Sequence, residues 1–488
     1  MRILQAYINR VAYELTTIII PLVPLTYLAH ILGPNGVGII AWSLTSVELF
    51  VMLFLHPLSL LGQLTLSNQR QDLPAQIQTF GNILFLRLIM TLITVGLFFW
   101  YYQSSAGWFI RDYAHELQLA SGLIIAGFLD ISWLYQGTGR RTNVVLQSSF
   151  SKIFLFLFVL LFVKTSTDID AYIILVVIIQ ILTNLLMWFR IPNAFWQKIR
   201  LRPQRYLRRW VPMMLSVAGL QLFYVIGRLL LPLYPLDFEL WVGYLDSAIK
   251  LLSVGTVIVI SIGLTTLPKF FHLANHGKFD DMLNHMNNVL ENVTAFGMAL
   301  MFGTLGMASG LTQWFLGVEY LRVGQLMMAL SPVLVLVGWS TVLGGQYLRV
   351  AGKNTLVTLS MLAGLATMLV FGVLLVPNHA GFGAVVAIDL AQLVIVIMQA
   401  FFARQVLSWH LFFKISWQYL LASAVMWLAV FIIGYRQIPA PFISFMQLVI
   451  GTIVYVGIIW ALRSPLINDA KQILREYSRF YRRNGFLK

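Results

Sequence analysis

The chain has 488 residues, of which 59% are hydrophobic and only 10% are charged, and its formal net charge is +15 at pH 7. Soluble globular proteins typically carry about 25% charged residues, so this composition indicates a membrane protein with no stretch left for a soluble catalytic domain. The lack of cysteine excludes disulfides, a thiol nucleophile and thiolate metal sites.

Apolar runs long enough to cross a hydrocarbon core of roughly 30 Å as helices recur from end to end. This pattern predicts an all-α polytopic membrane protein with fourteen spans. The first span is not followed by a small-residue cleavage site, so we expect it to stay in the mature protein. The expected spans are residues 11–32, 38–61, 80–101, 118–138, 145–164, 171–191, 211–232, 241–265, 287–308, 324–346, 356–376, 382–403, 415–434 and 442–462.

The basic residues indicate the orientation. An even number of spans places both termini on one side, and most of the 33 Lys and Arg residues fall on that side. Four lie inside spans, and the opposite side receives only Arg111, Lys164, Arg322 and Arg436. By the positive-inside rule both termini are cytoplasmic. The same asymmetry explains the basic net charge, so no nucleic-acid partner is expected.

A long basic loop, residues 192–210, follows the sixth expected span and divides the fourteen spans into groups of six, six and two. Each six-span half would begin and end in the cytoplasm, which predicts parallel repeats related by an axis along the membrane normal. The segments GVGIIAW and WVGYLDS, at the starts of the second and eighth spans, resemble each other as repeats would. The basic loop can equally be a device that fixes topology and rests its aromatic residues in the headgroup layer.

The expected divisions follow from this count. The last segment places apolar residues at helical spacing with basic residues between them, which favours an amphipathic helix on anionic membrane lipid over a regulatory contact with a partner. The divisions are 1–191, an N-terminal six-helix bundle; 192–210, a basic cytoplasmic loop; 211–403, a C-terminal six-helix bundle; 404–462, helices 13 and 14; and 463–488, a basic amphipathic cytoplasmic tail.

Ionisable residues within spans cost about 2.5–3.5 kcal/mol each on insertion scales, so they usually face a water-filled cavity or one another. We take the cations as candidates for binding an anionic substrate, and the carboxylates as candidates for ion coupling or charge pairing. The alternative is that they form buried ion pairs that fix helix packing. The cations are Arg87, Lys152, Arg228 and Lys250, and the carboxylates are Glu14, Glu48, Asp130, Asp246 and Asp389. Glu291, near a span end, is expected to reach the headgroup layer and is set aside.

Two prolines interrupt the first span. Pro21 and Pro24 each remove a backbone hydrogen bond, which predicts a bend that lets this helix bow between the bundles, followed by a tight turn over residues 33–38. A static kink that improves packing is the alternative. The chain contains no GxxxxGK[ST], HExxH or GxGxxG motif, so we expect no ATP hydrolysis, cofactor, metal or catalytic site.

Four segments resemble a known family. YLAHILGPNGVG (27–38), DISWLYQGTGR (130–140), TTLPKFFHLANHGK (265–278) and LLVPNHAGFGAVVAIDLAQ (374–392) occur in the order found in Wzx-type polysaccharide repeat-unit flippases. These belong to the multidrug/oligosaccharidyl-lipid/polysaccharide (MOP) exporter superfamily. His30 and Lys269 stand where the family usually has Arg, and Asp389 stands where it usually has Glu.

The resemblance implies two six-helix bundles arranged in a V in the bacterial cytoplasmic membrane. By alternating access they would move an undecaprenyl-pyrophosphate-linked oligosaccharide from the inner to the outer leaflet, for exopolysaccharide, capsule or O-antigen synthesis. The cations would then meet the pyrophosphate. Without a nucleotide site, the driving force is either an ion gradient, of H⁺ or Na⁺, or consumption of the product outside. A polymerase and other polysaccharide-assembly proteins would be the protein partners.

Several other functions stay open. Within the superfamily, the chain can be a lipid II or teichoic-acid precursor flippase or an ion-coupled drug exporter. A membrane polymerase or a lipid-sugar glycosyltransferase is disfavoured because the longest outer loops expected, 102–117 and 309–323, are short. A noncatalytic scaffold is disfavoured by the charges within the spans.

Overall fold

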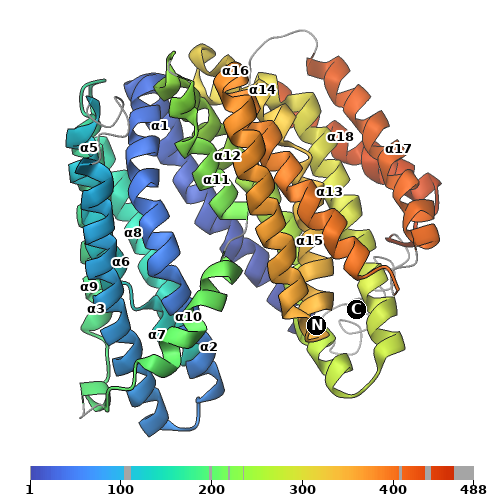
Figure 1. Ribbon diagram of the computed structural model, residues 1–488. Helices are drawn as coiled ribbons and strands as arrows, with labels where there is room; N and C mark the ends of the chain where they lie inside the picture. The colour runs from blue at the N-terminus through green and yellow to red at the C-terminus, as the bar shows by residue number, and fades with distance from the viewer. Residues whose placement is uncertain are drawn as a thin grey trace, which may run out of the picture. The chain divides into compact units, whose positions relative to one another are not determined.

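A computed structural model describes residues 2–103, 112–196, 200–217, 220–234, 236–405, 409–434 and 441–466. Within these ranges, side chains are described except at residues 2–21, 141, 211–217, 220, 275, 279 and 409–415. All regular elements in the described part of the chain are helices (Figure 1), which confirms the all-α prediction.

The helices are long and mostly apolar, and several run directly into a neighbour with a break of one or two residues. Their bounds are α1 Arg2–Phe54, α2 His56–Asn68, α3 Leu73–Gln103, α5 Ala114–Ala120, α6 Gly122–Leu129, α7 Ser132–Gly137, α8 Arg141–Phe162, α9 Ile169–Trp188, α10 Gln204–Val217, α11 Leu220–Leu229, α12 Phe238–Asn275, α13 Phe279–Leu316, α14 Leu321–Leu330, α15 Val333–Ser340, α16 Asn354–Phe402, α17 Trp409–Gly434 and α18 Pro441–Ala461. A π-helical turn, Thr341–Leu348, follows α15.

Among the described residues, ten helical stretches are long and apolar enough to cross a membrane, or eleven if a bent pair formed by Val318–Leu330 and Val333–Leu348 is one span. This confirms a polytopic membrane protein. Fourteen spans with cytoplasmic termini is a finer statement and stays a prediction.

The chain divides into two compact units. Unit 1 comprises Met1–Ile19, Ser247–Thr367 and Ile388–Lys488, and unit 2 comprises Ile20–Asp246 and Met368–Ala387. In unit 2, α2 packs on α7 and α10, and α9 packs on α5, α6 and α8. In unit 1, α13 packs on α14, α15, α17 and α18. The domain boundaries expected from the sequence, including the loop at 192–210, remain predictions.

Two long helices break where the sequence places the junction of neighbouring spans. In α1, Gly33 has φ 65° and ψ 176°, and the helix resumes at Pro34. Glycine accepts a positive φ, and proline begins a helix without losing a hydrogen bond, so one residue replaces the turn expected over 33–38. In α16 the break lies at Ala380, with φ 47° and ψ −128°. A positive φ is strained for alanine.

The expected bend at Pro21 and Pro24 stays a prediction. The backbone is helical at both residues, and the side chain of Pro21 lies outside the described ones.

Two glycines allow α1 and α12 to approach closely in unit 2. A Cβ on Gly38 would overlap the Glu239 carbonyl, and a Cβ on Gly243 would overlap the Pro34 carbonyl. Glu239 precedes Gly243 by four residues and Pro34 precedes Gly38 by four, so the contact is reciprocal. We call this contact the glycine crossing. It joins the two segments, GVGIIAW and WVGYLDS, whose similarity is noted above.

An aspartate shapes the turn between α8 and α9. The Asp168 Oδ2 atom accepts hydrogen bonds from the backbone N–H groups of Lys164 and Thr165, both at 2.8 Å. These bonds favour the ionised carboxylate and hold the pKa of Asp168 below its usual range. The negative charge therefore helps to close this turn.

Candidate functional site

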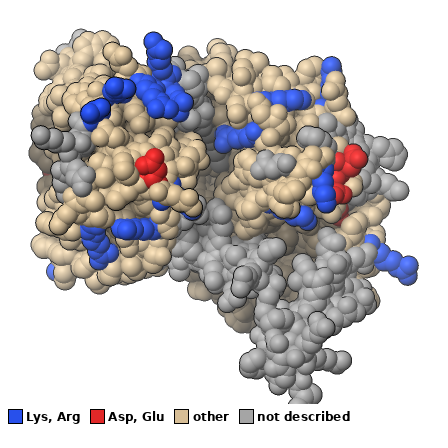
Figure 2. All heavy atoms as spheres, turned by 90° about the horizontal axis from the view of Figure 1, so that it is seen from below, with Lys and Arg blue, Asp and Glu red and all other residues tan. Residues whose placement is uncertain are grey.

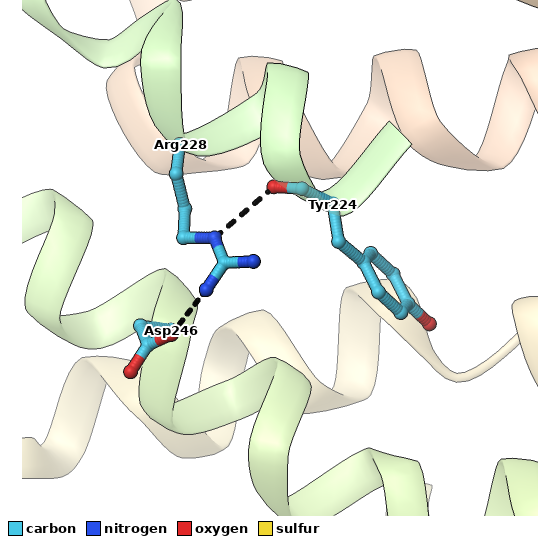
Figure 3. Close-up of polar contacts among 3 residues, drawn as sticks. All are labelled: Tyr224, Arg228 and Asp246. Atoms are coloured by element: carbon cyan, nitrogen blue, oxygen red, sulfur yellow. Dashed lines mark hydrogen bonds and ion pairs between the residues drawn. The ribbon is translucent and has the colours of Figure 1, made fainter. Parts of the chain in front are cut away.

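A buried ion pair joins α11 to α12 in unit 2 (Figure 3). The Nη1 atom of Arg228 lies 2.6 Å from Oδ1 of Asp246, and its Nε donates to the Tyr224 carbonyl at 3.2 Å. The side chains of Arg228 and Asp246 are only 9% and 1% exposed. Removing one partner of such a pair typically costs about 3–5 kcal/mol, because the other charge stays buried and uncompensated. The sequence selected both residues but not their pairing.

Arg87, on α3, is also buried, with 1% of its surface exposed. Its Nη1 donates to the Ser59 hydroxyl and, at 3.5 Å, to the Leu55 carbonyl. Its Nη2 donates to the Gly127 carbonyl. Leu55 lies between α1 and α2, and Gly127 lies in the last turn of α6. One guanidinium therefore connects two places where helices end inside unit 2.

The helix end at α6 explains why a cation is needed there. Asp130 takes an extended conformation, with φ −70° and ψ 106°, which ends α6, and its backbone N–H is shared between the carbonyls of Ala126 at 3.1 Å and Gly127 at 3.4 Å. Three side chains supply donors. Asn184 donates to the Ala126 carbonyl and Trp188 to the Leu129 carbonyl, both at 2.8 Å, while Arg87 reaches Gly127. A positive charge at a helix C-terminus also complements the helix dipole. We call this region the α6–α7 break.

Asp130 then starts the next helix. Its Oδ1 accepts the backbone N–H of Ser132 at 2.8 Å, and α7 begins at Ser132. Asp130 also acts electrostatically on Arg87 and His56. The Asp-x-Ser pattern within DISWLYQG is a typical capping signal. That signal could have indicated a helix break at Asp130, a residue selected from the sequence for its charge and for its place in the motif at 130–140.

Among the other selected charges, Glu48 acts electrostatically on His56, as Asp130 and Arg87 do. Lys152 is half-buried on α8, Lys250 is exposed on α12, and Glu48 is half-buried on α1. Asp389 lies in α16, and its Oδ1 is buried with no hydrogen-bond donor among the residues that the structure describes. The side chain of Glu14 lies outside the described residues. The roles predicted for these charges therefore stay predictions.

An aromatic cluster lies beside the glycine crossing. Trp42, Tyr113 and Phe238 meet edge to face, with ring centroids 5.8–6.1 Å apart. The Tyr113 hydroxyl donates to Oε1 of Glu239. Burial, aided by this carboxylate, raises the pKa of Tyr113, so it stays a neutral donor. The crossing is thus held by backbone contact and by packed rings.

An apolar cavity of about 320 Å³ lies between α13, α17 and α18 in unit 1. Its two longest polar side chains bond to the backbone: Gln447 donates to the Val430 carbonyl at 3.0 Å, and Tyr455 donates to the Ala295 carbonyl at 2.7 Å. These bonds leave a surface suited to hydrocarbon. The volume is at the lower end of the usual range for ligand pockets, roughly 300–1,000 Å³. Hydropathy cannot reveal this cavity, because its lining residues look like any apolar helix face.

A hydrogen-bond network lies one helical turn from the cavity lining. The Tyr419 hydroxyl is 2.5 Å from Oε1 of Glu291, to which it donates, and 2.6 Å from the Ser464 hydroxyl. Glu291 therefore accepts a hydrogen bond from a buried phenol, and its expected place in the headgroup layer stays a prediction. The phenol supplies a donor that makes the half-buried position tolerable.

Comparison with known proteins gives one relative in sequence. No family model matches the chain. A Shigella dysenteriae protein provisionally named an O-antigen transporter is 21% identical over 295 residues, which cover 59% of this chain and 73% of that protein.

Solved structures show the fold. The lipid II flippase MurJ in an inward closed conformation aligns with a TM-score of 0.68 at 16% identity, covering 92% of this chain and 98% of MurJ. An inward-facing multidrug MATE transporter of the MOP superfamily aligns with a TM-score of 0.59 at 13% identity, covering 80% of this chain and 98% of that one. A MOP transporter from Pyrococcus furiosus gives a TM-score of 0.55 at 12% identity, with 80% and 94% covered.

The apolar helices and these relatives describe a multi-pass protein of the bacterial cytoplasmic membrane. The relatives are transporters or flippases, and none of them is named as an enzyme. The chain has the fold of these MOP-superfamily transporters, and the Shigella relative agrees with the resemblance to Wzx-type flippases that the sequence motifs carry.

Proposed function

We propose that this protein flips an undecaprenyl-pyrophosphate-linked oligosaccharide from the inner to the outer leaflet of the cytoplasmic membrane. The geometric observation that carries the proposal is the apolar cavity between α13, α17 and α18. Its lining suits the hydrocarbon of a lipid-linked substrate, and it offers few groups to a sugar. The names of the Shigella relative and of MurJ, an O-antigen transporter and a lipid II flippase, support a substrate of this class.

We further propose fourteen spans with cytoplasmic termini. The breaks at Gly33 and Ala380 divide two long helices into two spans each, and the bent pair and the short apolar stretch Gln221–Leu233 supply the others. Lys and Arg are prominent on the face shown in Figure 2, and Asp and Glu are few. That face would meet the cytoplasm.

The charges would act during alternating access. We propose that Lys152 and Lys250 attract the pyrophosphate, and that the buried contacts of Arg87 and Arg228 maintain the conformation described. For coupling to H⁺ or Na⁺, the buried Oδ1 of Asp389, with no donor among the described residues, supports a carboxylate that takes up a cation. We expect Asp389→Asn to remove any dependence of transport on an ion gradient.

Reconstitution into liposomes tests the proposal. Vesicles would contain a labelled undecaprenyl-pyrophosphate oligosaccharide, and an enzyme added outside would modify only substrate in the outer leaflet. Parallel vesicles would contain lipid II or a cationic dye, because the MATE likeness makes drug export the second candidate. Faster exchange of the oligosaccharide lipid than of the other two, without ATP, supports the proposal. Sugar transfer or chain lengthening would instead indicate an enzyme.

A further inference from the structure

Helix α8 carries a row of stacked phenylalanines on an uncovered face of unit 2. Phe150, Phe154, Phe158 and Phe162 recur every four residues, and their successive centroids are 6.1–6.5 Å apart with interplanar angles of 10–34°. All four are 38–58% exposed. Only 6% of the most apolar window of α8 is buried, whereas the other candidate spans among the described residues range from 22% to 61%. We call this row the phenylalanine ladder.

A small polar notch lies at the first rung of the ladder. It has a volume of about 60 Å³, lies between α7, α8 and α9, and is lined by Asn143, Gln147, Phe150 and Arg190 among others. Gln147 is fixed by donating to Oδ1 of Asn184 at 2.8 Å. Arg190 lies just beyond the end of α9 and is exposed. The notch thus offers a cation and amides to an anion, in a space too small for a sugar chain but adequate for a phosphate group.

The length of this feature selects its occupant. From Asn143 to Phe162 the helix rises about 28 Å, nearly the full hydrocarbon thickness of roughly 30 Å. A phospholipid acyl chain ends near the midplane, so it would leave the far rungs without a matching chain. A polyprenyl chain is long enough to follow all four rings from a phosphate in the notch.

We propose that α8 is a docking site for a polyprenyl phosphate lipid, with the phosphate at Arg190 and the chain along the phenylalanine ladder. The inference rests on the proposed function and adds a place where the substrate is held at the protein surface. The notch lies at the end of α8 that begins with Arg141, and the ladder continues to the opposite end of the helix.

Photolabelling tests this site directly. The probe is a polyprenyl phosphate with a diazirine along its chain, in phosphatidylcholine vesicles that contain the full-length protein. Mass spectrometry then gives the fraction of α8 peptide that is labelled. One variant is F150L/F154L/F158L, which keeps apolar side chains but removes three rings. Its matched control is F371L/F442L/F445L, which changes three exposed rings on α16 and α18.

The cation is tested separately with Arg190→Gln, matched by Arg205→Gln at an exposed arginine on α10. We expect α8 labelling to fall about threefold in the ladder variant. For Arg190→Gln we expect about a tenfold fall, equivalent to about 1.4 kcal/mol. Neither control should change labelling. Leucine and glutamine at exposed sites should leave the fold intact, which thermal unfolding of each variant verifies.

Three results would overturn the site. They are labelling spread evenly over the lipid-facing helices, labelling that survives both variants, and displacement of the probe from α8 by an equal amount of phosphatidylglycerol. The flipping assay separates this inference from the function on which it rests. Labelling of α8 without flipping would refute only the function, and flipping without α8 labelling would refute only the docking site.

Discussion

Replacing Arg87 with methionine should loosen the α6–α7 break. The substitution keeps an unbranched side chain of similar length but removes the donors to the Gly127 carbonyl and the Ser59 hydroxyl. Ser59 already donates to the Leu55 carbonyl at 3.4 Å, and the Gly127 carbonyl would keep only a long contact, 3.4 Å, from the backbone N–H of Asp130. Lysine should not rescue the site, because a single ammonium cannot reach two helix ends as the planar guanidinium does.

The magnitude follows from these contacts. Each hydrogen bond to a charged group contributes about 1.5–3 kcal/mol. Arg87→Met removes two such hydrogen bonds, to Ser59 and to Gly127, so we expect it to destabilise the break by about 3–5 kcal/mol. Because each 1.4 kcal/mol changes an equilibrium tenfold, local opening should become more frequent by a factor of roughly 10² to 4 × 10³.

Hydrogen exchange of the backbone amides at residues 127–134 measures this opening. The matched control is Arg205→Met, an exposed arginine in the same unit. Measuring both lipid flipping and amide exchange of Arg87→Lys separates a structural role of Arg87 from a role in binding the substrate. If lysine preserves both slow exchange and transport, or if Arg205→Met accelerates exchange as much as Arg87→Met, the structural role assigned to Arg87 is wrong.

Three further predictions concern other contacts. Gly243→Ala should disfavour this conformation by about 1–3 kcal/mol, because the added methyl group overlaps the Pro34 carbonyl at the glycine crossing. The reporter is Ser43→Cys, a buried position in a chain without native cysteine, and adding Gly243→Ala should raise its labelling by maleimide about fivefold or more. Unchanged labelling would contradict this prediction. Arg228→Met should lower the thermal stability more than the double variant Arg228→Met/Asp246→Leu, because the double variant leaves no lone buried charge. An equal or greater loss of stability in the double variant would contradict the assignment of a buried ion pair. The turn closed by Asp168 should keep its full stability at pH values above the unfolded pKa of Asp168, near 3.9, and lose it as the pH falls through the lower pKa of the folded state. Amide exchange at residues 164 and 165 measures this loss, and Asp168→Asn should abolish its pH dependence.

The sequence predicts the helices well because their signals are local. Apolar runs predict the spans, and a glycine next to a proline predicts the junction at Gly33. The junction at Ala380 also falls between two predicted spans, although no glycine occupies the strained position. Such signals depend on a few neighbouring residues, so they need no knowledge of tertiary packing.

The partners of the charges could not be predicted in the same way. Arg228 and Asp246 are 18 residues apart on different helices, so no helical periodicity relates them. Arg87 bonds to the Ser59 hydroxyl and to two backbone carbonyls, one in the last turn of α6 and one between α1 and α2, and no local sequence pattern relates these places to residue 87. Burial within the membrane predicts that a charge needs a partner, but tertiary packing decides which partner it finds.

The rate of leaflet exchange in proteoliposomes tests the central claim most directly. The measurement is the initial rate at which a labelled undecaprenyl-pyrophosphate oligosaccharide becomes accessible to the externally added enzyme, compared with protein-free vesicles. A flippase predicts a rate that rises in proportion to the protein in the vesicles and needs no ATP. A rate equal to that of protein-free vesicles, with folded protein verified in the same membranes, would contradict the account.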